Sequence, residues 1–346
     1  MRNAITLLLL LLFPLLLSAQ NQQSKDSIQK VFDLVFEKLE ADYLHRKEID
    51  WEIWKQKIYP KALASPSLDS ALHFSSMIFD SIACNHCMIF SPESYFSSSL
   101  NQALEQEDFS SNFLLKYEQE PGFEAKLIQE EFGYILIPGM LLLDADQDSL
   151  NRVAQHMYDK ILSLSKAHEI KGWVIDLRFN IGGNLYPMLA ALYHLLGDAV
   201  VYTELDDESQ LTLVNQLDQG AIYCGEKMEV KITPTAQADL KTPVALISGR
   251  MTASAGEGVA MAFKGREKCI FLGEESYGLL TGNGMYELAF DVKMAMTTCY
   301  LADRNHVYRK SIIPDVSYIK QDNFEDPMRD PNIIKAVEFF NSHRKK

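Results

Sequence analysis

The sequence predicts an α/β fold, α+β in its overall layout, in which a bundle of helices precedes a core of strands and helices. Two patterns indicate this. Between residues 24 and 84 the apolar residues recur at helical spacing, which predicts three helices. From Phe132 onward, short apolar runs alternate with amphipathic periods, and this alternation is typical of a sheet covered by helices.

The composition is that of a folded globular protein. The chain has 346 residues, of which 47% are hydrophobic and 23% are charged. Its 47 acidic residues outnumber the 33 Lys and Arg residues, and the formal net charge is −14. Nucleic acid and anionic membrane surfaces are therefore poor partners for this chain, and we expect neither.

The N-terminus predicts export. Arg2 precedes an apolar block over residues 5–17, and Ala19 leads into polar sequence. This order is typical of a secretory signal peptide over residues 1–19. The block is shorter than the ~20 residues of a membrane-spanning helix, and Pro14 interrupts it. We expect a periplasmic or secreted protein without an integral membrane span after signal removal.

The mature chain is predicted to have three parts. Residues 20–105 form the helical lobe and residues 106–131 a connection of short strands, expected at 113–117 and 124–128. Residues 132–346 form the core and its C-terminal helix. Within the core we expect strands at 134–137, 172–177, 242–248, 268–272 and 292–300, and helices at 149–165, 185–196, 254–263 and 332–340.

Cys84 and Cys87 frame His86, a spacing that metal and redox sites use. No second Cys/His pair stands at ligand spacing, so we expect buried thiols, no metal and no cofactor.

Two turns carry candidate chemistry. The strand ending near Leu177 runs into Gly182 and Gly183 and then a helix. Such a turn presents backbone N–H groups to an anion, although glycine here also fits a tight turn with no further role. In the second turn, Ser254 has small neighbours and stands before a helix, as a nucleophile would. With Glu257 three residues later, it equally has the sequence of a capping box.

Four ordered motifs together are more specific. They are Asp-Leu-Arg-x-Asn-x-Gly-Gly-Asn at 176–184, Thr-Ala-Ser-Ala-Gly-Glu at 252–257, Gly-Glu-Glu-Ser-Tyr-Gly-Leu-Leu-Thr-Gly-Asn at 273–283 and Ile-Pro-Asp at 313–315. From about residue 71 to 340 the chain resembles the tail-specific (C-terminal processing) serine peptidases. It is most similar to the branch of the tricorn core protease, the nisin resistance protein and the interphotoreceptor retinoid-binding protein. The segment 93–132 is too short for the PDZ domain of the tail-specific enzymes.

The resemblance implies a crotonase/ClpP-like core of β-β-α units and a set of catalytic roles. Ser254 would be the nucleophile, and the amides of Ala255 and of Gly182 and Gly183 would form the oxyanion hole. Leu279 stands where the tail-specific branch has its catalytic Lys, which excludes a Ser/Lys dyad. His86, at the end of the helical lobe, would be the general base, as in the Ser/His branch.

The resemblance also places the substrate beside Leu279, Thr281 and Asn283. Asp176 and Arg178 are expected to form structural hydrogen bonds or ion pairs behind the turn. No residue is assigned to orient His86, and the acidic residues nearest the motifs are Glu257, Glu274 and Asp303.

The predicted function is that of an exported serine peptidase that cleaves protein or peptide substrates through an acyl-enzyme. The alternative is a non-catalytic protein that binds a peptide or a lipophile on the same fold. An acyl-CoA enzyme on this core is disfavoured, because its cofactor is cytoplasmic.

Overall fold

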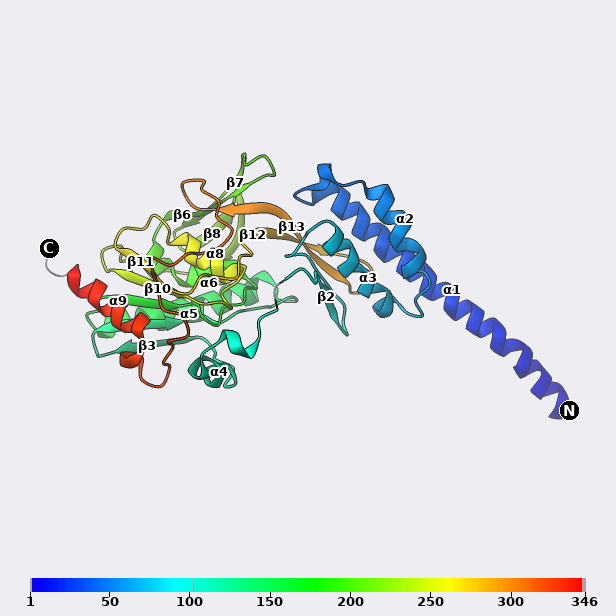
Figure 1. The fold of residues 1–346 in the computed structure, drawn as a ribbon, viewed down its shortest axis with the longest axis horizontal. Coiled ribbons are helices and arrows are strands. Elements are labelled where there is room, and N and C mark those ends of the chain that lie inside the picture. Colours follow the sequence, from blue (N-terminus) through cyan, green and yellow to red (C-terminus); the bar gives the residue numbers. More distant parts are fainter. Residues whose placement is uncertain (1, 102, 344–346) are drawn as a thin grey trace. The chain divides into compact units, whose positions relative to one another are not determined.

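The structure is a computed structural model that describes the backbone of residues 2–101 and 103–343 and the side chains of residues 22–101 and 103–343. The chain divides into two compact units (Figure 1). The N-terminal unit comprises Met1–Ala103 and Asn283–Cys299, and the core unit comprises Leu104–Gly282 and Tyr300–Lys346. A hairpin from the second half of the sequence thus belongs to the first unit.

The N-terminal unit contains the three predicted helices. They are α1 (Arg2–Asp42), α2 (Trp51–Ala62) and α3 (Leu68–Ser81), with the short 3₁₀ helix η1 (Arg46–Glu48) between the first two. Asp50 caps α2 by accepting the Ile53 N–H, and Ser67 caps α3 by accepting the Ser70 N–H. Two short strands, β1 (Met88–Phe90) and β2 (Tyr95–Ser97), follow α3 and pair antiparallel.

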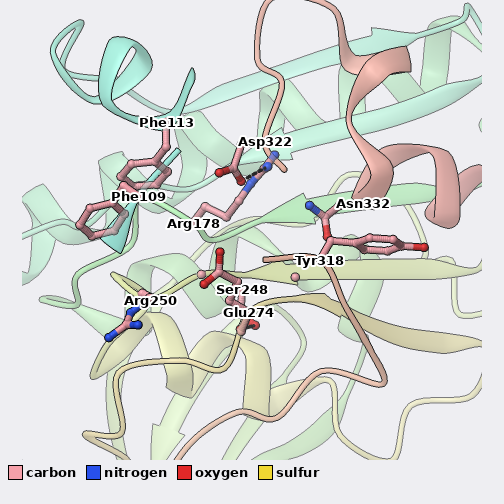
Figure 2. Close-up of a pocket in the computed structure, with 11 residues that line it drawn as sticks. Phe109, Phe113, Arg178, Ser248, Arg250, Glu274, Tyr318, Asp322 and Asn332 are labelled. Atoms are coloured by element: carbon pink, nitrogen blue, oxygen red, sulfur yellow. Dashed lines mark hydrogen bonds and ion pairs between the residues drawn. The ribbon is translucent and has the colours of Figure 1, made fainter. Parts of the chain in front are cut away.

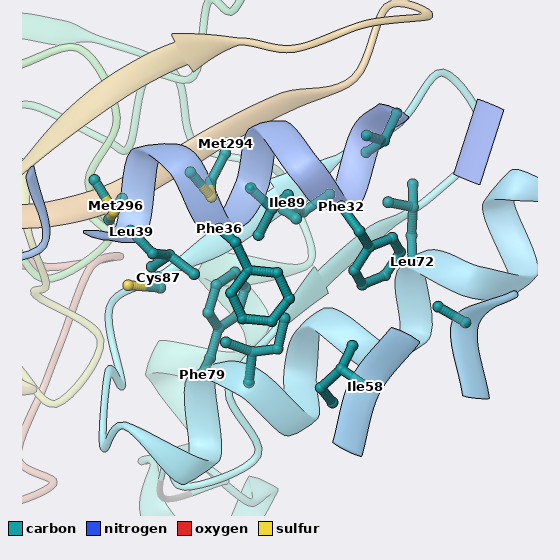
Figure 3. Close-up of a cluster of buried hydrophobic side chains, with 14 of the residues drawn as sticks. Phe32, Phe36, Leu39, Ile58, Leu72, Phe79, Cys87, Ile89, Met294 and Met296 are labelled. Atoms are coloured by element: carbon teal, nitrogen blue, oxygen red, sulfur yellow. The ribbon is translucent and has the colours of Figure 1, made fainter. Parts of the chain in front are cut away.

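The apolar helix faces form one core (Figure 3). Phe32 and Phe36 of α1 and Phe79 of α3 are fully buried in it or nearly so. The strands β12 (Thr281–Glu287) and β13 (Lys293–Ala302) pair with each other, and β13 also pairs with β1, which brings Met294 and Met296 into the same core. The hairpin adds side chains to this core through contacts between residues far apart in the sequence, and local periodicity could not predict them.

The cysteine expectation is wrong, because Cys84 and Cys87 form a disulfide with a Cα–Cα separation of 5.5 Å. The turn after α3 explains the pairing. The Cys84 N–H donates to Phe79 O (2.8 Å) and the Cys87 N–H donates to Cys84 O (3.4 Å), so the two side chains are held within reach of each other.

The core unit is built on a six-stranded sheet with the order β14-β11-β10-β5-β4-β3, parallel except for β3. Its strands are β3 (Glu124–Ile128), β4 (Phe132–Leu136), β5 (Trp173–Asp176), β10 (Val244–Ser248), β11 (Cys269–Gly273) and β14 (Val316–Ser317). β4, β5 and β10 are buried along their whole length, as strands of a parallel sheet covered on both faces should be.

An antiparallel meander forms a second sheet in the core unit. It consists of β6 (Ala199–Leu205), β7 (Leu211–Asp218), β8 (Ala221–Cys224) and β9 (Lys227–Lys231), and residues 300–302 of β13 pair with β6. The helices that contact this sheet are α5 (Gln147–Ala167), α6 (Leu185–Ala191) and α8 (Ala255–Ala262), and the short α7 (Tyr193–Leu196) follows α6. A further helix, α9 (Pro331–Ser342), packs on β10 and β11 after η3 (Pro327–Arg329). The predicted α/β fold with N-terminal helices is confirmed.

The connection over residues 106–131 is only partly made of strands. The predicted strand at 124–128 is β3, but 113–117 lies within the helix α4 (Ser111–Tyr117), which follows η2 (Gln106–Asp108). Ser110 caps α4 by accepting the Phe113 N–H (2.9 Å), and the Phe113 ring stacks on Phe179. The cap and the stacking override the strand preference of the aromatic residues.

Over the described part of the chain, no helix combines the length and the apolar character that crossing a bilayer requires. The side chains of the predicted signal peptide, residues 1–19, lie outside the described residues, and the signal peptide stays a prediction.

Candidate active site

Ser254 stands where the chain turns from β10 into α8. Thr252 fixes this turn, since its hydroxyl donates to Leu177 O (2.8 Å) and accepts the Gly249 N–H (2.8 Å). Ser254 has φ +51° and ψ −116°, which is outside the regions that a residue with a side chain normally occupies. A strained strand-to-helix turn of this kind exposes the nucleophile in hydrolases.

Glu257 lies in the first turn of α8, and its carboxylate is fully buried. It accepts the N–H groups of Ser254 (2.8 Å), Leu279 (2.8 Å) and Gly278 (2.9 Å) and the hydroxyl of Ser276. Burial raises the pKa of Glu257 above its usual value, and the hydrogen bonds that it accepts oppose the rise. Ser254 and Glu257 therefore do form a capping box, but one whose first residue has an unusual backbone conformation.

The glycine turn lies against Ser254. A Cβ added at Gly182, where φ is +111°, would come within 2.8 Å of Ser254 Cβ. At Gly183, where φ is +105°, an added Cβ would overlap the carbonyl of Met140. Both positions require glycine, because a side chain would meet strain as well as a clash.

The backbone amides around Ser254 differ in their partners. The Gly182 N–H donates to Asn180 Oδ1 (3.0 Å), so it has an acceptor within the core unit. Because Gly182 has no side chain, its backbone can lie close to Ser254. Within residues 103–343, no acceptor is bonded to the N–H of Gly183 or of Ala255. Both amides are thus available to a ligand.

In the N-terminal unit, His86 lies in the turn closed by the disulfide. Its carbonyl accepts the side-chain amide of Asn283 (2.7 Å), and Asn283 Oδ1 in turn accepts the Thr297 hydroxyl (3.0 Å). His86 is 6% exposed, and burial lowers its pKa to about 4. The ring is therefore neutral at neutral pH, as a general base must be.

The residues expected beside the substrate differ in their surroundings. The side-chain amide of Asn283 donates to His86 O, and Asn283 Oδ1 accepts the Thr297 hydroxyl. Leu279 is only 8% exposed, and its N–H is bound to Glu257. Thr281 is partly exposed at the start of β12.

Arg178 is the centre of a buried charge cluster behind the glycine turn. Its guanidinium donates to Asp176 (2.6 Å), Asp330 (2.6 Å) and Asp322 (2.7 Å) and lies 4.2 Å from the Phe324 ring centroid. Figure 2 shows Arg178 and Asp322 in a small pocket at the carboxyl ends of the parallel strands. The expected structural role of Asp176 and Arg178 is confirmed.

The other acidic candidates are engaged elsewhere in the core unit. Glu274 accepts the Lys320 N–H (2.8 Å), and Asp303 is paired with Arg309 (2.9 Å). Over residues 22–101 and 103–343, no three His, Cys, Asp or Glu side chains are grouped so as to hold a metal ion.

Comparison with known proteins agrees with this geometry. Residues 131–318, more than half of the chain, match the model of peptidase family S41. The chain belongs to peptidase family S41. This confirms the family to which the four sequence motifs pointed.

Individual proteins are similar to the S41 chain in sequence or in fold. The nisin-resistance protein of Lactococcus lactis subsp. lactis is 33% identical over 147 residues, which cover 42% of this chain and 45% of that protein. The match thus spans less than half of that relative. A lipoprotein from Streptococcus agalactiae shares the fold with a TM-score of 0.67 at 19% identity, over 92% of this chain and 97% of that one. A putative peptidase from Parabacteroides merdae gives a TM-score of 0.54 at 15% identity, over 91% and 96%.

Sequence reasoning missed the partners that hold the candidate residues in place. Ser276 and Gly278 stand within the third motif, but nothing in the motif shows that they bind Glu257. Asn283 likewise contacts His86 from 197 positions away. Such contacts depend on the tertiary fold and leave no local signal.

Proposed function

We propose that this chain is an exported serine peptidase that hydrolyses peptide bonds of proteins or peptides through an acyl-enzyme. Ser254 is the nucleophile and His86 the general base. The observation that carries the proposal is the strained conformation of Ser254 at the N-terminus of α8, against the Gly182–Gly183 turn.

The proposed reaction has two halves. In the first, Ser254 Oγ attacks the carbonyl carbon of the scissile bond while the His86 imidazole takes the hydroxyl proton. The N–H groups of Gly183 and Ala255 donate to the developing oxyanion, and the protonated imidazole then gives its proton to the leaving amine. In the second half, water attacks the acyl-enzyme by the same route, which releases the acid and restores Ser254.

Export and a peptide substrate are parts of the same proposal. The apolar segment over residues 5–17 predicts a signal peptide, and one structural relative is described as a lipoprotein. A peptide substrate is supported by membership of a peptidase family and by likeness to a protein named for nisin resistance.

The dependence of kcat/KM on pH below 7 tests the role of His86 as the general base. Burial lowers its pKa from 6.5 to about 4, and only the neutral ring accepts a proton. We expect kcat/KM to stay level as the pH falls from roughly 7 to 5 and to decline only as it approaches about 4. Steady-state assays across this range measure it, and a decline centred near the ordinary histidine pKa would contradict a buried base.

Loss of folding must be separated from this titration. The unfolded chain takes up a proton at His86 near its usual pKa, before the folded chain does, so stability falls as the pH drops through that window. Thermal unfolding recorded at each pH identifies the range in which the protein remains folded.

The proposed function itself is tested by covalent labelling. The full chain is treated with a fluorophosphonate, which phosphonylates activated serines, and is also incubated with a peptide pool. Mass spectrometry is expected to find the label on Ser254 and to find new peptide termini. A folded protein that shows neither label nor cleavage would overturn the proposal, and peptides or lipids retained through purification would then favour the binding protein.

A further inference from the structure

Glu257 has a role in the core unit that the proposed reaction does not use. Its carboxylate is fully buried and accepts four hydrogen bonds, three from backbone N–H groups and one from a hydroxyl. An isolated buried charge is costly, and four donors are what such a carboxylate needs to remain ionised. The arrangement is too complete to be an ordinary helix cap, in which the acidic residue bonds only the N-cap amide.

The four donors come from two separate segments. One is Ser254, the first residue of the α8 turn. The other three lie in the loop of residues 276–279, which the chain reaches only after α8 and β11. Glu257 is thus the point at which this loop and the nucleophile turn are joined.

The junction is reinforced from both sides. The Tyr277 N–H donates to Thr252 O (2.8 Å), so the loop also bonds the turn directly. The Ser276 hydroxyl, which donates to Glu257, accepts the Ile312 N–H (2.7 Å), and the Ser276 N–H donates to Ile312 O (3.1 Å). The position of the carboxylate is therefore determined by the surrounding fold and not by α8 alone.

The consequence for Ser254 is geometric. The Ser254 N–H points at the carboxylate, and this bond stabilises a backbone conformation that a serine does not otherwise favour. The next amide, that of Ala255, keeps no acceptor in the described core unit. Because Glu257 binds the Ser254 N–H, the adjacent Ala255 N–H remains able to donate to the oxyanion.

We propose that Glu257 is a positioning residue, which fixes the nucleophile Ser254 and the adjacent amide in their reactive geometry and couples them to the loop that carries Leu279. This inference rests on the proposed function. Glu257 does not touch the reacting atoms, and its effect is transmitted through the Ser254 backbone. A displacement of about 1 Å at a reacting group costs about 100-fold in rate, which sets the expected scale.

The test compares Glu257→Gln with the matched variant Glu274→Gln. Both changes remove one carboxylate of the core unit, but Glu274 bonds the Lys320 N–H and not Ser254. Glutamine at position 257 would direct an NH₂ group at N–H donors. We expect the second-order rate of fluorophosphonate labelling to fall about 100-fold in Glu257→Gln and to stay within about 2-fold of wild type in Glu274→Gln.

The fluorophosphonate is small, so its labelling rate reports the geometry of Ser254 without contacts to an extended substrate. The midpoint of thermal unfolding of each variant is measured in parallel. Glu257→Gln that is folded at the assay temperature and labels within about 3-fold of wild type overturns the inference. Folded wild-type protein that neither labels at Ser254 nor cleaves peptides overturns the proposed function instead, so the two failures are distinguishable.

A second pair of variants applies if Glu257→Gln does not fold. Ser276→Ala removes one donor and leaves the carboxylate, and Glu257→Asp keeps the charge on a shorter side chain. We expect labelling to slow about 3- to 10-fold in Ser276→Ala, and kcat to fall more than KM rises in Glu257→Asp. Rates equal to wild type in both variants overturn the inference.

Discussion

Replacement of Ser254 by alanine is expected to lower kcat/KM for peptide hydrolysis by about 10⁴-fold or more. The reason is that no acyl-enzyme forms without the hydroxyl, and only binding and the oxyanion donors then remain. Alanine carries the same backbone strain at φ +51° and also removes the hydroxyl that accepts the Glu257 N–H, so the free energy of unfolding should fall by about 0.5–2 kcal/mol. Steady-state cleavage of a peptide identified in the product analysis provides the measurement.

Combining Ser254→Ala with His86→Ala tests whether the two residues act in the same step. If Ser254 and His86 act in one step, Ser254→Ala combined with His86→Ala should be no slower than Ser254→Ala alone, because residues that act as a unit are not additive. Losses that multiply would assign His86 a role outside proton transfer. Ser254→Ala that keeps more than about one per cent of wild-type activity would remove Ser254 from the mechanism.

Arg178→Met is expected to destabilise the fold by about 3–5 kcal/mol. Methionine fills part of the volume, but it leaves the carboxylates of Asp176 and Asp330 buried without their cation, and Asp322 nearly so. A loss of this size is a large share of the 5–15 kcal/mol that typically stabilises a domain. Urea unfolding followed by circular dichroism gives the difference.

An exposed ion pair supplies the control for this variant. Lys335 pairs with Glu338 on the surface of α9 at 3.0 Å, so Lys335→Met should change stability by less than about 0.5 kcal/mol. Asp330→Asn added to Arg178→Met should recover part of the loss, because it removes one unpaired charge. Equal stabilities of Arg178→Met and wild type would mean that the cluster does not contribute to the fold.

Periodicity predicted those elements whose burial follows from their own sequence. The three N-terminal helices have continuous apolar faces, and β4, β5 and β10 are short apolar runs. The meander from β6 to β9 was not predicted, although β7 alternates between exposed and buried residues near its end and Gly220 and Gly225 mark the turns. That signal was present in the sequence.

Other parts could not be predicted, because distant residues decide them. Whether Cys84 and Cys87 are thiols or a disulfide depends on the turn after α3. At the candidate site, the motifs identify Ser254 and the two glycines, since their chemistry and conformation are local. The Asn180 side chain that accepts the Gly182 N–H and the loop that binds Glu257 are set by the tertiary fold, so the motifs could not predict these contacts.

The hairpin of β12 and β13 ties the two units together by connectivity. The chain leaves the core unit at Gly282 and returns at Tyr300, so three peptide links, and not one, join the units. Deleting residues 1–103 would therefore not excise a separate module, because Val292, Met294 and Met296 would lose the side chains that bury them. Removal of the whole N-terminal unit would require cutting the chain at three places, two of them on either side of residues 283–299.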